Sequence, residues 1–329
     1  MKQKVLITGA SGFVGFHLIE AALAKGLDVY AAVRKSSDVK HLISHNVKYV
    51  YPDFTSVESL EKELKEKQYD FIIHAAGTTK AKNQDEYNKV NAGYSVNLAK
   101  AAANHGSGLQ KMVFLSSLAS IGPSKQSNEL IKENKTPEPV TAYGVSKLLA
   151  EEKLKELNLP LIVFRPTAVY GAREKDIFII LKTFSQGFEP YIGRNEQELS
   201  FVYVKDLAAL TINSLFTGDT ANGTYNITDG NCYSRYDMAN ITKNVLSKKT
   251  LKVHLPLPVV KAIAVVLEKG YGIFDKIPAL NLEKLNELNA VNWCCDIEKA
   301  RKELGFNPAY NLQQGLKEAL EWYKLNKWI

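Results

Sequence analysis

Cysteine is scarce in this sequence, and no metal-binding pattern is present. Its 329 residues contain three cysteines, of which Cys294 and Cys295 are adjacent, and six scattered histidines. This spacing provides neither a disulfide framework nor a Cys-x-x-Cys motif for metal or redox chemistry. We therefore expect free thiols, as in a reducing compartment, and no metal cofactor.

Long apolar runs are also missing. The longest candidate, Val259 to Leu267, is too short to cross a bilayer, and it is interrupted by Lys261 and followed by Glu268 and Lys269. It lies within an apolar stretch from Leu255 to Ile273. With no signal-peptide pattern at the N-terminus, we predict a cytoplasmic protein without stable membrane insertion. The stretch itself could form a lid over a hydrophobic substrate or touch a membrane surface. Its few charges form no basic face, which favours a core helix of the C-terminal part.

The charge balance does not indicate nucleic-acid binding. The formal net charge is +7, from 42 basic and 35 acidic residues. The lysines are spread along the chain and mixed with glutamates, which is typical of a solvated surface rather than of a basic binding face. We expect a small-molecule substrate and no nucleic-acid partner.

Short apolar strands alternate with helices up to about residue 166. This alternation predicts a Rossmann-type α/β fold, a doubly wound parallel sheet covered on both faces. Beyond Pro166 the pattern becomes mixed and then mainly helical. We predict an NAD(P)-binding domain at 1–170 plus 198–228 and a smaller, mostly helical substrate-binding lobe at 171–197 plus 229–329. The predicted strands cover residues 5–8, 29–33, 47–51, 71–76, 112–116, 161–164, 199–204 and 225–227.

A glycine-rich turn follows the first predicted strand. Glycines in such a turn let the backbone approach a pyrophosphate, and the N-terminus of the following helix offers unpaired N–H groups to the phosphates. The strand–turn–helix context makes this pattern more specific than its glycines alone. We assign to the cofactor the residues Gly9, Ser11, Gly12, Phe13, Val14 and Gly15.

The end of the second strand indicates which dinucleotide binds. NAD enzymes usually carry an acid there, but this chain has Arg34 and Lys35 and no acid before Asp38. An arginine can bind a 2′-phosphate through two hydrogen bonds, so NADP(H) is favoured and NAD(H) remains possible. Asp53 and Phe54, after the third strand, are candidates for the adenine contact.

Tyr143 and Lys147 lie four residues apart on a predicted helix and therefore share a face. A nearby ammonium lowers the pKa of a tyrosine, which ordinarily lies near 10, and so makes the tyrosine a better proton-transfer group. Ser117, after the fifth strand, is placed to bind and polarise a substrate oxygen. These three residues predict hydride transfer at a carbonyl or secondary-alcohol carbon, with Tyr143 as acid and base.

Taken together, these motifs resemble the extended short-chain dehydrogenases/reductases of the NAD-dependent epimerase/dehydratase superfamily, over nearly the whole chain. The resemblance implies Ser117, Tyr143 and Lys147 as the catalytic set and a substrate pocket between the sheet domain and the C-terminal lobe. It also implies a possible homodimer through the helices at about 86–105 and 142–157. Besides Tyr143 and Lys147, the matching motifs place at the cofactor the residues Ala75, Ala76, Gly77, Asn91, Ser116, Pro166, Thr167 and Val169.

Departures from the family patterns narrow the choice of member. The dehydratases carry an Asp-Glu pair where this chain has Leu118 and Ala119. The epimerases carry an asparagine after the sixth strand and an arginine that binds a diphosphate, where this chain has Thr167 and Leu199. Arg173, Arg194 and Arg235 are candidates to replace that arginine, but the sequence does not show where their side chains point.

The segment 116–122 and the pattern around Arg34 are most similar to the branch of dihydroflavonol-4-reductase and 3β-hydroxysteroid dehydrogenase. We therefore predict an NADP(H)-dependent reductase of a small, fairly apolar substrate. The alternatives are an NAD-dependent nucleotide-sugar epimerase and a catalytically silent dinucleotide-binding sensor.

Overall fold

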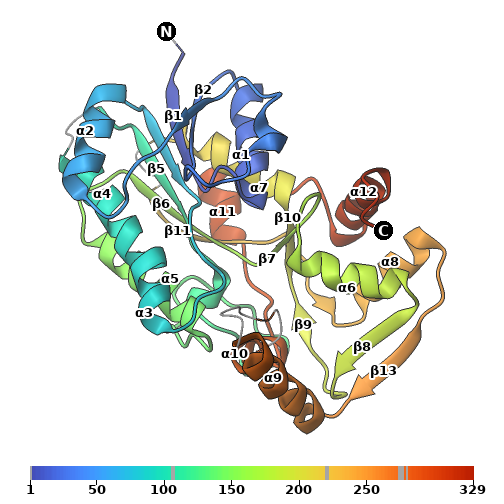
Figure 1. Cartoon of the computed structure of the whole chain (residues 1–329). Helices are drawn as coiled ribbons and strands as arrows, with labels where there is room; N and C mark the ends of the chain where they lie inside the picture. Colours follow the sequence, from blue (N-terminus) through green and yellow to red (C-terminus); the bar gives the residue numbers. More distant parts are fainter. Residues whose placement is uncertain (1, 105–107, 219–221, 273–277, 279–280) are drawn as a thin grey trace.

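Seven parallel strands form the central sheet of the computed structural model, which describes residues 2–104, 108–218, 222–272, 278 and 281–329 (Figure 1). The spatial order is β11-β6-β5-β4-β1-β2-β3, so the chain runs outward from β1 in both directions. This confirms the predicted Rossmann-type fold. The strands are β1 (Lys4–Thr8), β2 (Asp28–Ala32), β3 (Lys48–Val50), β4 (Phe71–His74), β5 (Lys111–Leu115), β6 (Leu161–Pro166) and β11 (Gly223–Ile227).

Helices cover both faces of this sheet, because alternate residues of each strand point to opposite sides. Val5, Ile7 and Val113 pack in one core cluster, whereas Leu6 and Met112 pack in the other. The first cluster lies under α1 (Phe13–Ala24), α7 (Val204–Ser214) and α11 (Glu298–Leu304). The second lies under α2 (Val57–Lys67), α4 (Tyr94–Asn104) and α5 (Ala142–Lys155).

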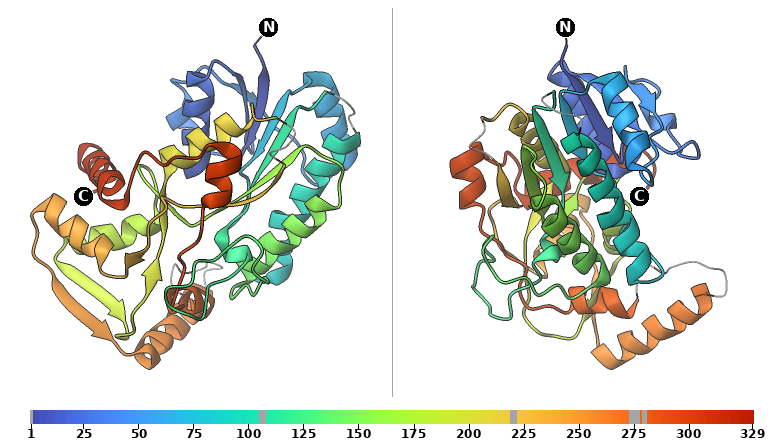
Figure 2. Two further views of the ribbon diagram at one scale, coloured as in Figure 1. Left: turned by 180° about the vertical axis from the view of Figure 1, so that it is seen from behind. Right: turned by 90° about the vertical axis from the view of Figure 1, so that its left-hand side faces the viewer.

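Three short two-stranded ladders and five helices make up most of the remaining chain, which Figures 1 and 2 show beside the sheet. The ladders pair β7 (Ala168–Tyr170) with β10 (Phe201–Tyr203), β9 (Glu198–Leu199) with β12 (Tyr233–Ser234), and β8 (Phe188–Ile192) with β13 (Leu251–Leu255). The helices are α6 (Asp176–Ser185), α8 (Asp237–Leu246), α9 (Leu257–Gly272), α10 (Leu282–Leu288) and α12 (Leu312–Leu325). The division into two domains stays a prediction, and α11, from the C-terminal part, packs on the sheet beside β11.

The expectation of free thiols is wrong. Cys232 and Cys294 form a disulfide, although we expected free thiols; Cys295 alone remains a buried thiol. A separation of 62 residues carries no sequence signal, because only the folding of the lobe brings the two cysteines together. The apolar stretch forms α9, which buries Val260 and Ala264 in a small core cluster with Leu285 and exposes Val259, Ile263 and Val266 on its other side. Ile273 lies outside the described residues. No helix among the described residues has the length and apolar character needed to span a membrane.

Candidate active site

Ser117 and Tyr143 meet at the carboxyl end of β5. Ser117 begins a short 3-10 turn, Leu118–Ser120, whose backbone carries Ala119 against the first turn of α5. Thr141 caps α5 by accepting a hydrogen bond from the Gly144 N–H at 3.1 Å. A Cβ atom on Gly144 would lie 2.3 Å from the Ala119 carbonyl oxygen, so only glycine permits this close approach. The helix thereby brings the Tyr143 hydroxyl into a hydrogen bond with Ser117.

The Tyr143 hydroxyl lies deep in the protein although its ring is partly exposed. Burial raises the pKa of Tyr143 to about 12, the hydrogen bond with Ser117 opposes this shift, and the negative charge of Glu287 adds to it. We expected Lys147 to lower this pKa, but its ammonium instead donates to the Leu115 carbonyl at 2.8 Å. In this geometry Tyr143 is protonated at neutral pH and suited to donate a proton.

Lys147 is a buried cation. Its ammonium lies 4.8 Å from the centre of the Phe114 ring. Burial lowers the pKa of Lys147 to about 8, and the carboxylate of Glu151, one helical turn further along, opposes that shift. Lys147 therefore stays mostly charged at neutral pH and loses its proton in mildly alkaline solution.

The glycine turn has the features of a phosphate site. Gly9 has φ +68°, and a Cβ there would lie 2.8 Å from the Ala75 carbonyl carbon. A Cβ on Gly15 would lie 2.1 Å from the Gly9 oxygen, so the helix packs directly on the turn. Gly12 precedes α1, which has no side-chain cap and no acid in its first turn. These residues fit a dinucleotide pyrophosphate. Ser11, Phe13 and Val14 lie on the same turn and the start of α1.

The loop after β4 contacts both the segment before this turn and α5. The Ala76 N–H donates to Thr8 Oγ1 at 3.0 Å. A Cβ on Gly77 would lie 3.0 Å from Asn91 Oδ1 and 3.3 Å from Lys147 Nζ, so these three residues converge. Asn91 donates to Ser146 Oγ at 2.9 Å. It also exchanges hydrogen bonds with the Thr78 backbone, so its side chain positions the loop.

The end of β6 offers an unpaired polar group. Thr167 follows Pro166, and its hydroxyl is buried without a hydrogen-bond partner among the described residues, as expected of a group that binds a ligand. Val169 is partly buried beside it. Ser116 differs from the expectation, because its hydroxyl points to Glu151 at 2.5 Å and is occupied within the protein.

The predicted adenosine-end residues follow the carboxyl ends of β2 and β3, the two strands farthest from β6 and β11 in the strand order. Arg34 and Lys35 are exposed, and Asp38 accepts a hydrogen bond from the Lys40 N–H within its own loop. Asp53 accepts from the N–H and the hydroxyl of Thr55, and these hydrogen bonds hold its pKa below the usual range. The ring of Phe54, partly buried, lies 6.1 Å from that of His74.

His74 is a structural residue under the site. Its Nδ1 pairs with Thr8 Oγ1 at 2.7 Å and its Nε2 with Ser95 Oγ at 2.8 Å. Burial lowers the pKa of His74 to about 3, and the charge of Lys147 adds to the effect. The imidazole is therefore neutral, and it links β1 and β4 to α4.

Two carboxylates of α10 lie near the site, and the sequence did not predict them. Glu283 accepts hydrogen bonds from the backbone N–H groups of Ala142 and Tyr143 at the start of α5. The charge of Glu287 acts on the Tyr143 hydroxyl. No sequence pattern could reveal them, because about 140 residues separate them from α5.

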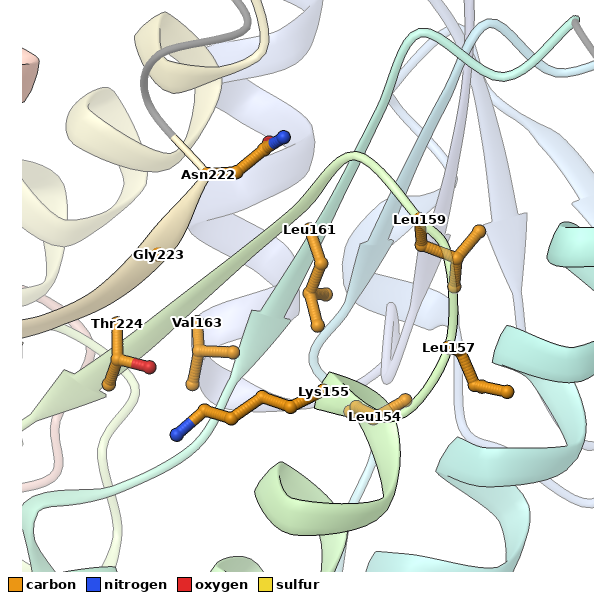
Figure 3. A pocket seen from close by; sticks show the side chains of 9 residues that line it. All are labelled: Leu154, Lys155, Leu157, Leu159, Leu161, Val163, Asn222, Gly223 and Thr224. Carbon is orange, nitrogen blue, oxygen red and sulfur yellow. The ribbon is translucent and has the colours of Figure 1, made fainter.

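A hollow of about 260 Å³ lies where the loop before α5 faces α10 and the residues that follow it. It is lined by Pro123, Ser124, Lys125, Glu138, Val140, Asn286, Asn289, Ala290 and Val291. A second hollow, of about 230 Å³, lies at the start of β6 and β11 and the end of α5, and Figure 3 shows Leu154, Leu161 and Val163 among its lining side chains. It is at the opposite end of the strands from Ser117 and does not belong to the catalytic site.

Among known proteins, this chain is similar to enzymes with different reactions. It is 26% identical to a UDP-glucose 4-epimerase of Vibrio cholerae, over 98% of this chain and 95% of that protein. It is also 26% identical to a decarboxylating sterol-4-alpha-carboxylate 3-dehydrogenase of Candida albicans, over 97% of each. A ceramide reductase of Caulobacter vibrioides is 22% identical, over 99% of this chain and 96% of that protein.

Solved structures show the same fold. A UDP-glucose 4-epimerase from Thermotoga maritima, in complex with UDP-glucose, has a TM-score of 0.79 at 20% identity, covering 99% of this chain and 100% of that one. WbmG of Bordetella bronchiseptica, in complex with NAD, has a TM-score of 0.78 at 19% identity, covering 99% and 95%. The model of the NAD dependent epimerase/dehydratase family matches residues 5–228. Since that match exceeds half of the chain, this protein belongs to the NAD-dependent epimerase/dehydratase family.

Proposed function

We propose that this protein is an NADP(H)-dependent oxidoreductase that transfers hydride between the nicotinamide and a carbonyl or secondary-alcohol carbon of a small, fairly apolar substrate. The meeting of Ser117, Tyr143 and Lys147 at one strand end carries the proposal. The bound nicotinamide supplies or accepts the hydride. Ser117 orients the substrate oxygen, and Tyr143, protonated at neutral pH, donates the proton that converts it to a hydroxyl. Lys147 holds a positive charge beside them.

The lobe offers little support for binding a diphosphate. The Arg235 guanidinium donates to the Asn195 and Ile192 carbonyls at 2.7 and 2.8 Å, so it serves the lobe itself. The Arg173 guanidinium lies 4.0 Å from the Phe16 ring centre and 5.5 Å from that of Trp322. Two of the three candidate arginines thus make contacts within the protein, which favours a substrate without a diphosphate. Against this, Arg194 is exposed, and the buried Nε of Arg235 has no hydrogen-bond partner among the described residues.

The residues that follow Ser117 argue in the same direction. Leu118 and Ala119 are buried, so no acid–base pair stands beside the catalytic serine. Dehydration of a sugar requires such a pair to move protons at neighbouring carbons. Hydride transfer with one proton needs only the groups present here.

NADP(H) is part of the proposal because Arg34 is exposed at the end of β2 and Asp38 is turned into its own loop. The first experiment assays freshly purified protein for bound nucleotide and then titrates it with NADPH and NADH by fluorescence. We expect an empty preparation, tighter binding of NADPH, and about tenfold loss of that preference in Arg34→Ala. Lys65→Ala, at an exposed position of α2, is the control.

An NAD-dependent nucleotide-sugar epimerase is the second candidate, and the similarity to UDP-glucose 4-epimerases favours it. Such an enzyme retains its cofactor and needs no added reductant. Tightly held NAD(H) in the fresh preparation, together with conversion of UDP-glucose to UDP-galactose, would replace the reductase proposal.

The catalytic assignment is tested with NADPH and three neutral ketones: cyclohexanone, acetophenone and 4-phenylbutan-2-one. Tyr143→Phe is expected to lower kcat at least 100-fold while NADPH still binds, because general acid catalysis is lost. Tyr87→Phe is the matched control, since its ring centre lies 6.3 Å from that of Tyr143 and its hydroxyl donates to the Thr79 carbonyl. No reduction of any ketone by the wild type, together with dinucleotide binding that Tyr143→Phe leaves unchanged, would indicate a catalytically silent dinucleotide sensor.

A further inference from the structure

Glu151 is a fully buried carboxylate on α5, one helical turn beyond Lys147. It accepts hydrogen bonds from Ser116 Oγ at 2.5 Å and from Ser120 Oγ at 2.7 Å. The guanidinium of Arg165, on β6, donates to it through Nε at 3.0 Å and Nη2 at 2.6 Å. One side chain therefore joins β6, the turn after β5 and α5.

Each segment that supplies a catalytic group is tied to this carboxylate. Ser116 and Ser120 flank Ser117, and the Ser120 N–H donates to the Ser117 carbonyl at 3.0 Å. Tyr143 and Lys147 are on the same helix as Glu151. Arg165 lies two residues before Thr167, whose buried hydroxyl has no partner in the described part of the chain.

Stability alone is a weak reason for such an arrangement. Removing two charges from water costs several kcal/mol per ion, and a buried ion pair is often no more stabilising than well-packed apolar side chains. A fully hydrogen-bonded buried network does, however, restrict its members to one geometry. Here that geometry is the mutual placement of the Ser117 turn and α5.

We propose that Glu151 is a positioning residue of the active site, which holds the Leu118–Ser120 turn against α5 so that the hydroxyls of Ser117 and Tyr143 meet. The proposal rests on the proposed function where the rate of ketone reduction is measured. It does not rest on it where binding of NADPH or NADH, whichever binds more tightly, is measured, because binding requires only the family's dinucleotide site.

Glu151 also acts on Lys147 through charge. The pKa of Lys147, lowered to about 8 by burial, is held up by the negative charge of Glu151. Arg165 and Lys155, the latter 4.0 Å away, share that negative charge. His74, from β4, also faces Lys147 and is neutral above about pH 3. Without the negative charge on residue 151, Lys147 would lose its proton at a lower pH.

Three variants test the proposal: Glu151→Gln, Ser120→Ala and a control, Glu189→Gln. Binding of the dinucleotide that the wild type prefers, NADPH or NADH, is titrated by fluorescence from pH 6 to 10. The kcat is measured across the same range with the best ketone of the panel. We expect Glu151→Gln to lower kcat about 10- to 100-fold, the scale of a small misplacement of reacting groups. Lys147 Nζ lies beside Gly77 of the predicted dinucleotide site, so we expect binding of the dinucleotide to weaken as Lys147 loses its proton. In Glu151→Gln this weakening should occur at lower pH.

Ser120→Ala keeps every charge and removes one hydrogen bond between the turn and α5. It covers the possibility that Glu151→Gln does not fold. We expect a fall in kcat of about tenfold with the alkaline loss of binding at its wild-type pH. A kcat equal to that of the wild type in folded Ser120→Ala would argue against the positioning role.

Glu189 is a matched buried carboxylate in the lobe, 2.9 Å from Lys243 Nζ and 2.5 Å from Thr250 Oγ1. Glu189→Gln should lose stability without moving the pH dependence of NADPH binding. An equal movement in this control, or none in folded Glu151→Gln, would overturn the proposal. Failure of the wild type to reduce any ketone would count against the proposed function, while the binding titration would still decide the role of Glu151.

Discussion

At the scale of the residue, burial sets the chemistry of this site more than sequence neighbours do. Tyr143 and Lys147 are four residues apart, yet the ammonium of Lys147 donates to the Leu115 carbonyl and burial raises the pKa of Tyr143. The four-residue spacing correctly indicates a shared helix face. It does not reveal the direction of either pKa shift, because that depends on the surrounding strands and turn.

Replacing Lys147 with methionine should stabilise the protein and abolish catalysis. The pKa of Lys147 is lowered to about 8, so its charged form opposes folding at neutral pH. At roughly 1.4 kcal/mol per tenfold change in proton affinity, and after the loss of the hydrogen bond to Leu115, we expect a gain of about 2 kcal/mol in unfolding free energy at pH 7.

Urea denaturation measures this difference as a function of pH. The wild type regains the lost stability between pH 8 and 10.5, because there the folded state releases the proton that the unfolded state still binds. The gain in Lys147→Met should therefore shrink over that range. A variant less stable than the wild type at pH 7 would contradict the prediction.

His74 should make the protein sensitive to mild acid. Its pKa is lowered to about 3, so the unfolded state takes up a proton below pH 6.5 and the folded state does not. This contribution is complete above pH 6.5 and is lost as the pH falls toward 3. Between pH 7 and 5.5 we expect the wild type to lose about 1 kcal/mol more unfolding free energy than His74→Asn. Equal losses in chemical denaturation would refute this.

At the scale of the element, close packing places the catalytic helix. The sequence predicts a single helix at about 86–105, but the structure has α3 (Gln84–Tyr87), a π-helical segment Asn88–Gly93 and then α4. The wide turn contains Asn91, which binds Ser146 on α5. Such π turns are common at functional sites. The periodicity of apolar residues could not reveal the π-helical segment, because that segment occurs where Asn91 makes contacts with residues distant in sequence.

Gly144→Ala should displace α5 from the Ser117 turn. Its Cβ would lie 2.3 Å from the backbone oxygen of Ala119, which has no room to move aside as a flexible side chain would. We expect kcat to fall at least tenfold, with NADPH binding retained.

Gly270→Ala, on α9, has no heavy atom within 4 Å of the new Cβ and is the control. It should raise helix stability by roughly 0.5–1 kcal/mol without affecting kcat. Equal kcat in both variants would disprove the packing argument.

At the scale of the whole molecule, the sheet is completed by a distant segment. β11 (Gly223–Ile227) pairs with β6, and α7 packs on α1, although both follow the start of the lobe in sequence. The predicted segment at 225–227 was correctly read as a strand, but its partner could not be identified from pattern. Pairing of distant segments depends on the topology, which local periodicity does not contain.

A fragment of residues 1–170 should therefore fail to fold into a stable monomer. Without β11, β6 becomes an exposed edge strand, and without α7, part of the apolar face of α1 loses its cover. We expect aggregation in size-exclusion chromatography and no cooperative thermal transition by circular dichroism. A monomeric fragment with cooperative unfolding would show that the first segment is independent.

Local sequence pattern predicts the strands, the glycine turn and the set of Ser117, Tyr143 and Lys147. It can do so because a short stretch of sequence is enough to indicate a strand, its end and a tight turn. The contacts that define the site are of another kind. Glu283 at the start of α5, Glu151 beneath Ser117 and the Cys232–Cys294 disulfide join residues brought together only by the fold. The direction of each pKa shift depends likewise on burial and neighbouring charge, which exist only once the chain has folded.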